Sequence, residues 1–275
     1  MGERAGRVSR AMRSARTAAM VVLAALLCAA TSSPLAIGGV TLGEPIGSVV
    51  SSFGAPGLVE TTDQGQEWRW YDQNGLDVDL LTDDGLVVRQ VLVAQPVSLD
   101  GQPSPLVQPP EFPLLETSVT VAAATLRRSG ATPVIEPNPA VGAWRIGADY
   151  LVLQLANGSV RKLLALDRDA ATRAGYIGAA QPVGAFHAPR LIQQYAVDYP
   201  RKAVQEHASG VVVVRADISA TGAVTAVTVV VSSKNPDIDE AEVQSISRSK
   251  FRPALCDGVA CAGVYLDREE YTLDD

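Results

Sequence analysis

The feature that most constrains the fold is a series of local patterns that occurs twice, over residues 41–93 and again over residues 118–166. Each copy begins with apolar residues spaced i, i+3, i+4 and i+7, which lie on one face of a helix. A Gly-Ala pair with a nearby proline follows, and glycine directly after a helix fits a left-handed cap. Because three strand-like runs complete each copy, we predict an internal duplication of one helix packed on a three-stranded antiparallel sheet. The helix stripes are Ile46, Val49, Val50 and Phe53, and Val119, Ala122, Ala123 and Leu126.

Tryptophans and turn dipeptides mark the strands of both copies. Trp68 and Trp144 each stand at the start of a strand-like run. The later turns read Asp-Gly at residues 84–85 and Asn-Gly at residues 157–158, which suits a type I′ hairpin because its two central residues need positive φ. We expect each tryptophan to fill the core between helix and sheet, and exposed recognition tryptophans are the alternative.

The two copies are similar to small envelope modules of the SmpA/BamE lipoprotein and β-lactamase-inhibitor type. The shared order is a helix, a glycine-proline turn, a tryptophan strand and a strand after an Asp-Gly-like turn. This resemblance implies a binding or scaffold role without chemistry. By fold analogy alone it also allows an inhibitor of a secreted enzyme.

The first 33 residues have the layout of an export signal, with five arginines, an apolar run at residues 18–30 and then Thr and Ser. The run is short for a membrane span, which needs roughly 20 residues, so a cleaved signal and an uncleaved anchor both stay open. Lipidation at Cys28 is disfavoured because Leu27 stands where a lipobox requires a small residue. Either way, we expect the remaining chain to be exported to the periplasm. The arginines are Arg4, Arg7, Arg10, Arg13 and Arg16.

Charge and motif content argue against nucleic-acid binding and enzyme chemistry. The chain has a net charge of −7, whereas a phosphate-binding surface needs clustered Lys and Arg. A hydrolase needs a nucleophile with a positioned base, and no Gly-x-Ser-x-Gly elbow occurs. His187 and His207 have no evident orienting partner. We therefore expect no enzyme, no cofactor and no metal site.

The C-terminal region is predicted to have the order α-β-β-α-β. Proline at residue 200 can start a short helix, and β-branched runs at residues 211–218 and 224–231 flank an Ala-Thr-Gly turn. Turn and cap residues end at residue 237, and the carboxylates within residues 238–241 suit the first turn of a second helix, which is expected to end near Lys250. Residues 263–273 are expected to form the final strand.

Four ordered blocks of this region, DYPRKA, SGVVVVRADISATGAVTAVTVVVSS, IDEAEVQSI and FRPALCDGV, resemble the C-terminal domain of TonB-type energy transducers. The resemblance covers residues 184–275 and implies a three-stranded antiparallel sheet with the last strand at an edge. In that family the edge binds the N-terminal box peptide of TonB-dependent outer-membrane receptors by β-strand addition. A capped edge without a partner is the alternative. The residues expected to bind the partner are Ala262, Gly263, Val264, Tyr265, Leu266, Asp267, Arg268, Glu269, Glu270 and Tyr271.

Two departures from the TonB pattern leave two functions open. The apolar N-terminal run has no histidine, and the two repeats stand where the family has a long Pro-Lys/Glu spacer. One function is a TonB-like transducer or adaptor that transmits energy from inner-membrane motor proteins. The other is a soluble periplasmic binding or assembly adaptor without a motor.

Two smaller features of this region concern a carboxylate and a cysteine pair. Glu242 shares a helix face with Ile238 and Ile246, at a position where the family pattern has alanine. Because burying an unpaired carboxylate is costly, we expect it to reach solvent, pair with a basic group or face a partner. Cys256 and Cys261 flank an Asp-Gly turn and favour a disulfide in an oxidising compartment, with two free thiols as the alternative.

The predicted fold class is α+β, with tandem α-β-β-β repeats followed by the TonB-like domain. The expected segments are a signal peptide or anchor at 1–33, repeat 1 at 41–95, a Pro-rich linker at 96–113, repeat 2 at 114–167, a second linker at 168–185 and the TonB C-terminal-like domain at 186–275.

Overall fold

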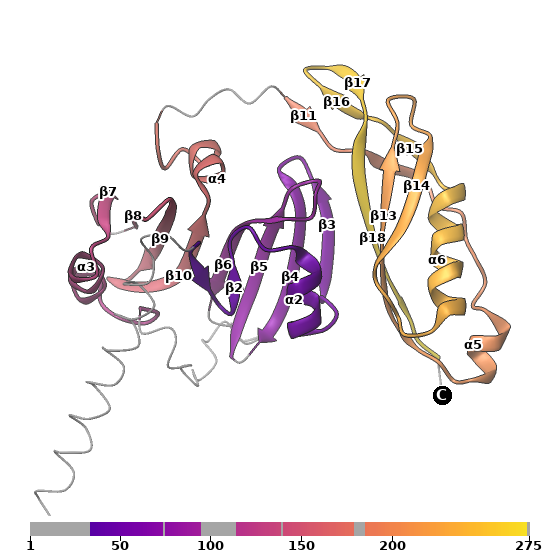
Figure 1. The fold of residues 1–275 in the computed structure, drawn as a ribbon, viewed down its shortest axis with the longest axis horizontal. Coiled ribbons are helices and arrows are strands. Elements are labelled where there is room, and N and C mark those ends of the chain that lie inside the picture. The colour runs from indigo at the N-terminus through magenta and orange to yellow at the C-terminus, as the bar shows by residue number, and fades with distance from the viewer. Residues whose placement is uncertain (1–33, 74, 95–113, 139, 179–184, 274–275) are drawn as a thin grey trace, which may run out of the picture. The chain divides into compact units, whose positions relative to one another are not determined.

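The computed structural model describes residues 34–73, 75–94, 114–138, 140–178 and 185–273. The expected export signal and the Pro-rich linker at 96–113 lie outside these residues. The chain is a mixed α and β protein whose sheets are antiparallel (Figure 1). It divides into two compact units. Unit 1 contains residues up to Leu42, Tyr71–Val78 and Gln90–Ala180, and unit 2 contains Gly43–Trp70, Asp79–Arg89 and Gln181–Asp275. No helix in the described parts of the chain is long and apolar enough to span a membrane.

Unit 1 is built mainly on antiparallel strands that neighbour one another in the order β6-β10-β9-β8-β7. Ser118 caps its helix α3 by accepting a hydrogen bond from the Val121 N–H. Trp144 is fully buried in this sheet. The elements of this unit are β1 (Ala36–Ile37), β2 (Val40–Thr41), α3 (Val119–Arg128), β7 (Thr132–Ile135), β8 (Val141–Ile146), β9 (Asp149–Ala156), β10 (Ser159–Leu166), α4 (Arg168–Arg173) and most of β6 (Val88–Ala94).

The segment expected as a second linker, residues 168–185, begins with helix α4. Asp167 caps this helix by accepting a hydrogen bond from the Ala170 N–H. Ala170 and Ala171 are buried against β9 and β10. This part of the segment is therefore packed structure and not an extended connection.

Unit 2 opens with helix α2 (Ile46–Phe53) and the hairpin of β3 (Leu58–Thr62) and β4 (Gly65–Gln73), and it shares β4 and β5 (Leu76–Thr82) with unit 1. Trp68 is fully buried, and its indole N–H donates to Thr82 Oγ1. Both predicted core tryptophans thus lie in the interior. The prediction of three strands per copy is wrong by one strand in each, because β3 and β7 precede the expected runs. The duplication itself stays a prediction.

The C-terminal part of unit 2 has the expected order α-β-β-α-β. Its three long strands form an antiparallel sheet in the order β14-β13-β18. The main elements are α5 (Arg201–Gln205), β13 (Gly210–Ile218), β14 (Val224–Val231), α6 (Pro236–Arg248) and β18 (Gly263–Tyr271). Short strands that the sequence did not predict are β11 (Phe186–His187), β12 (Arg190–Gln193), β15 (Lys250–Arg252), β16 (Ala254–Cys256) and β17 (Val259–Cys261).

Helix α6 covers one face of this sheet. Asn235 caps the helix by accepting hydrogen bonds from the N–H groups of Asp237 and Ile238. Alternate residues of β13 point toward the helix and are fully buried, as the period of two in a strand requires. The core of this layer consists of Ala203, Val212, Val214, Ala216, Ile218, Ile238, Ile246 and Phe251.

Candidate partner-binding edge

Strand β18 is the terminal strand of its sheet. It pairs with β13 along its whole length, from Gly210 opposite Tyr271 to Ile218 opposite Gly263, without a bulge. The hydrogen-bonded strand order of this sheet, within the described residues, ends at β18. The predicted partner-binding residues therefore lie on the edge strand, except Ala262, which directly precedes it.

Alternate residues of β18 direct their backbone N–H and C=O groups to the outer side of the strand, away from β13. In an antiparallel strand the N–H and C=O of one residue point to the same side, and the next residue points to the other. The Leu266 N–H and the Val264 carbonyl both point away from β13, toward the β3–β4 hairpin. Residues 264, 266, 268 and 270 thus share the outer edge, and their odd-numbered neighbours pair with β13.

The outer edge of β18 is met by side chains of the β3–β4 hairpin, and β3 lies beside β18 (Figure 1). The Leu266 N–H donates to Thr61 Oγ1 at 2.8 Å, and Gln66 Nε2 donates to the Val264 carbonyl at 3.3 Å. The Thr61 hydroxyl in turn donates to Gln66 Oε1 at 2.8 Å. A linked pair of polar side chains therefore satisfies two edge groups where a strand would offer its backbone.

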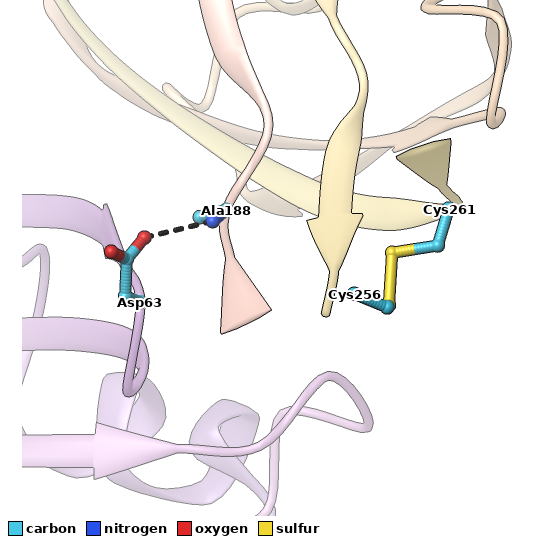
Figure 2. Close-up of a disulfide and its surroundings, with 4 residues drawn as sticks. All are labelled: Asp63, Ala188, Cys256 and Cys261. Atoms are coloured by element: carbon cyan, nitrogen blue, oxygen red, sulfur yellow. Dashed lines mark hydrogen bonds between the residues drawn. A yellow bond between two sulfur atoms is a disulfide. The ribbon is translucent and has the colours of Figure 1, made fainter. Parts of the chain in front are cut away.

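Two further contacts fix the hairpin along the edge. At its base, Arg268 Nε donates to the Pro56 carbonyl at 2.9 Å. At its tip, Asp63 Oδ1 accepts from the Ala188 N–H at 2.8 Å, and Asp63 Oδ2 lies 3.0 Å from His187 Nδ1 (Figure 2). The hydrogen bond from Ala188 and the neighbouring His187 lower the pKa of Asp63. The carboxylate form therefore holds the tip.

The cysteine pair closes a small hairpin next to this contact (Figure 2). Cys256 and Cys261 are joined by a disulfide with a Cα–Cα separation of 5.9 Å, within the usual range. Asp257 and Gly258 between them both have positive φ, as expected for the Asp-Gly turn. The bond links β16 to β17.

Glu242 is buried between α6 and β18, with 1% of its surface exposed. The Tyr271 hydroxyl donates to Glu242 Oε2 at 3.1 Å, and the Tyr265 hydroxyl donates to Asp267 Oδ1 at 3.3 Å. Burial, and then the charge of Asp267, raise the pKa of Glu242 to about 7. Burial also raises the pKa values of Asp267 and Glu269. The carboxyl group therefore does not reach solvent, and its partner is a tyrosine hydroxyl.

Across the described parts of the chain, no three His, Cys, Asp or Glu side chains are arranged to hold a metal ion. Sequence reasoning located β18 but not Thr61, Gln66 or Pro56. These residues lie roughly 200 positions before their partners, with separations of 198 to 212, so no local pattern could reveal the contact.

Comparison with known proteins gives one family assignment and several weak structural similarities. No curated protein matches the chain. One similar solved structure is a cysteine-rich secretory protein from Staphylococcus aureus subsp. aureus Mu50, with 13% identity, 54% of this chain and 51% of that chain covered, and a TM-score of 0.38. Another is an extracellular protein containing an SCP domain from Bacillus anthracis str. Ames, with 9% identity, 48% and 46% covered, and a TM-score of 0.33.

A third is a DUF4309 family protein from Bacillus subtilis subsp. subtilis str. 168, with 11% identity, 53% of this chain and 96% of that chain covered, and a TM-score of 0.34. The aligned part spans about half of the first two structures. At these scores the similarities support no conclusion about function.

The family match falls on the sheet described above. The family model described as "Gram-negative bacterial TonB protein C-terminal" matches residues 195–269. These residues contain α5, β13, β14, α6 and most of β18. Residues 195–269 of this chain are therefore a TonB C-terminal domain.

Proposed function

We propose that this chain is a TonB-like envelope protein that binds a partner by β-strand addition to the outer edge of β18. The observation that carries the proposal is that no strand pairs with the outer side of β18 among the described residues: its outward N–H and C=O groups are met by side chains. An added strand can satisfy such groups in sequence, so the backbone supplies affinity and alternate side chains supply selectivity. The partner class is the extended N-terminal segment of a TonB-dependent outer-membrane receptor.

The chain would act on the periplasmic side of the Gram-negative envelope, to which the N-terminal export signal would direct it. The TonB C-terminal domain supports an envelope location. With an uncleaved anchor, the chain would transmit energy from inner-membrane motor proteins to the receptor. Intact mass and membrane partition of the protein recovered from an envelope fraction test this, because a full-length membrane-bound chain is the form that can couple to a motor.

The second candidate is a periplasmic adaptor that binds the same kind of segment without a motor. It is favoured by the lack of histidine in the apolar run at residues 18–30, since the family anchor carries one. A freely soluble chain shortened near Ala30 would support this candidate and exclude energy transduction.

The proline variant Val264→Pro tests strand addition directly. The Val264 N–H points away from β13, so proline removes an outer donor while the β13–β18 ladder keeps its bonds. The matched control is Val264→Ala, which loses the same buried side chain but keeps the N–H. The probes are fluorescein-labelled synthetic peptides that cover the N-terminal segments of the outer-membrane receptors encoded in the same genome.

We expect at least one peptide to bind the wild-type chain and the Val264→Ala variant, with binding lost in Val264→Pro. Circular dichroism must show the same folded content in both variants. Equal peptide binding by Val264→Pro and Val264→Ala would exclude strand addition at this edge.

A further inference from the structure

The outer edge of β18 is already occupied in the folded chain. Thr61 and Gln66 of the β3–β4 hairpin contact the edge groups that a partner strand would use. The contact is well packed, because Gln66, Val264 and Leu266 are all buried, with 2%, 6% and 2% of their surfaces exposed. A partner cannot reach these groups while the hairpin is in place.

The hairpin and a partner strand exclude one another by distance. A strand added to a sheet lies about 4.8 Å from its neighbour, within the layer of backbone hydrogen bonds. Thr61 Oγ1 lies 2.8 Å from the Leu266 nitrogen, inside that space. Thr61 must therefore leave before a backbone carbonyl can accept the Leu266 N–H.

The hairpin holds the edge through side chains rather than as an added strand. β3 is the terminal strand of its own sheet and pairs with β4 from Leu58 opposite Arg69 to Thr62 opposite Gly65. Among the residues that the structure describes, it forms no ladder with β18, whose sheet there consists of β14, β13 and β18. Its hold depends on the Thr61–Gln66 pair, on Asp63 at the tip and on Arg268 at the base.

We propose that the β3–β4 hairpin is an autoinhibitory cap on the outer edge of β18, which an incoming strand must displace in order to bind. This inference rests on the proposed function, because it regulates the same edge. The cap protects an edge that would otherwise be open to pairing with other chains. Displacement breaks the hydrogen bonds made by Thr61, Gln66, Asp63 and Arg268 and forms a backbone ladder in their place, so a partner strand that forms more bonds than these can bind.

The released variant that tests this is the double substitution Thr61→Val and Gln66→Met in the full chain. Both new side chains keep approximately the shape of the originals, but neither can bond the Leu266 N–H or the Val264 carbonyl. The matched control is Thr62→Val, because Thr62 Oγ1 donates to the Gly65 carbonyl and accepts from the Gln64 N–H, both inside the hairpin. Unchanged tryptophan fluorescence from the buried Trp68 and Trp70 checks that the hairpin stays folded.

Hydrogen exchange of the Leu266 amide reports release, and the labelled receptor peptides described above report binding. We expect exchange at Leu266 to rise roughly tenfold in the released variant and peptide affinity to rise by a similar factor, with neither changed in Thr62→Val. Unchanged exchange, or faster exchange with equal affinity for wild type and variant, would refute the cap and leave strand addition standing. Faster exchange with no peptide bound by either chain would instead refute strand addition itself, and the cap with it.

Discussion

Glu242→Gln should make the TonB C-terminal domain less sensitive to pH. In the wild type, burial and the charge of Asp267 raise the pKa of Glu242 from 4.5 to about 7. The folded state therefore favours the protonated carboxyl. The stability contributed by this group is fully present below pH 4.5, the unfolded value, and is lost as the pH rises through about 7.

The magnitude follows from the size of the pKa shift. At about 1.4 kcal/mol per pH unit, the rise of the pKa from 4.5 to about 7 gives a ceiling of about 3 to 4 kcal/mol lost between pH 4.5 and 8. Asp267 and Glu269 face the same group and also have raised pKa values, so the carboxyls share this loss. Glutamine cannot ionise but can still accept the hydrogen bond from Tyr271. We therefore expect Glu242→Gln to stabilise the domain by about 2 kcal/mol at pH 8 and to change its stability little at pH 5.

Hydrogen exchange of the buried β13 amides measures the unfolding free energy of this domain separately from that of the rest of the chain. A gain of about 2 kcal/mol slows exchange by roughly 30-fold at pH 8, once intrinsic rates are corrected. The control is Glu240→Gln on the same helix, where the side chain is exposed and the effect should stay within about 0.5 kcal/mol. An identical pH dependence of wild type and Glu242→Gln, or a loss of stability at pH 8, would refute the reasoning.

Two further predictions concern the disulfide and one glycine. Replacing Cys256 and Cys261 with serine should destabilise the β16–β17 hairpin by about 2 kcal/mol on the loop-entropy estimate, seen as faster exchange of its amides, and reduction of the wild type should give the same result. Gly222→Ala should cost at least about 2 kcal/mol, because its φ is +83° and a Cβ there would lie 2.4 Å from the Phe251 carbonyl oxygen. Gly258→Ala is the matched control, since φ is +79° but the space is open, and thermal unfolding should show a clearly smaller loss. Equal losses at the two glycines would show that the close approach to Phe251 has no energetic consequence.

The parts of the fold that the sequence predicted are those with long periodic segments. The β-branched runs of β13 and β14 and the capped helix α6 each carry enough residues for a pattern to be recognised. The expected end of α6 near Lys250 was two residues too late, because β15 begins there. Helix α4 was missed although Asp167 is a good capping residue, because the surrounding segment was interpreted as a linker.

The short strands could not have been found by the same reasoning. β11 has two residues and β16 three, too few for an alternating pattern. Their pairing depends on chain segments that are far apart in sequence, as with Phe186 opposite Cys256. Similarly, the apolar stripe identified Glu242 as unusual, but only the folded chain shows that Tyr271 is its partner.

The chemistry of the cap explains how one edge can be both protected and available. If β3 paired with β18 as a ladder, release would break a hydrogen bond for almost every residue of the strand, at about 1 kcal/mol net each. Thr61 and Gln66 instead satisfy two edge groups. Together with the contacts of Asp63 and Arg268, release breaks four hydrogen bonds, at about 4 kcal/mol, with the buried contact added. A partner strand that forms more than four ladder bonds can offset the hydrogen-bond part of this cost. A side-chain cap therefore suits an edge that must avoid unwanted pairing and still accept a specific strand.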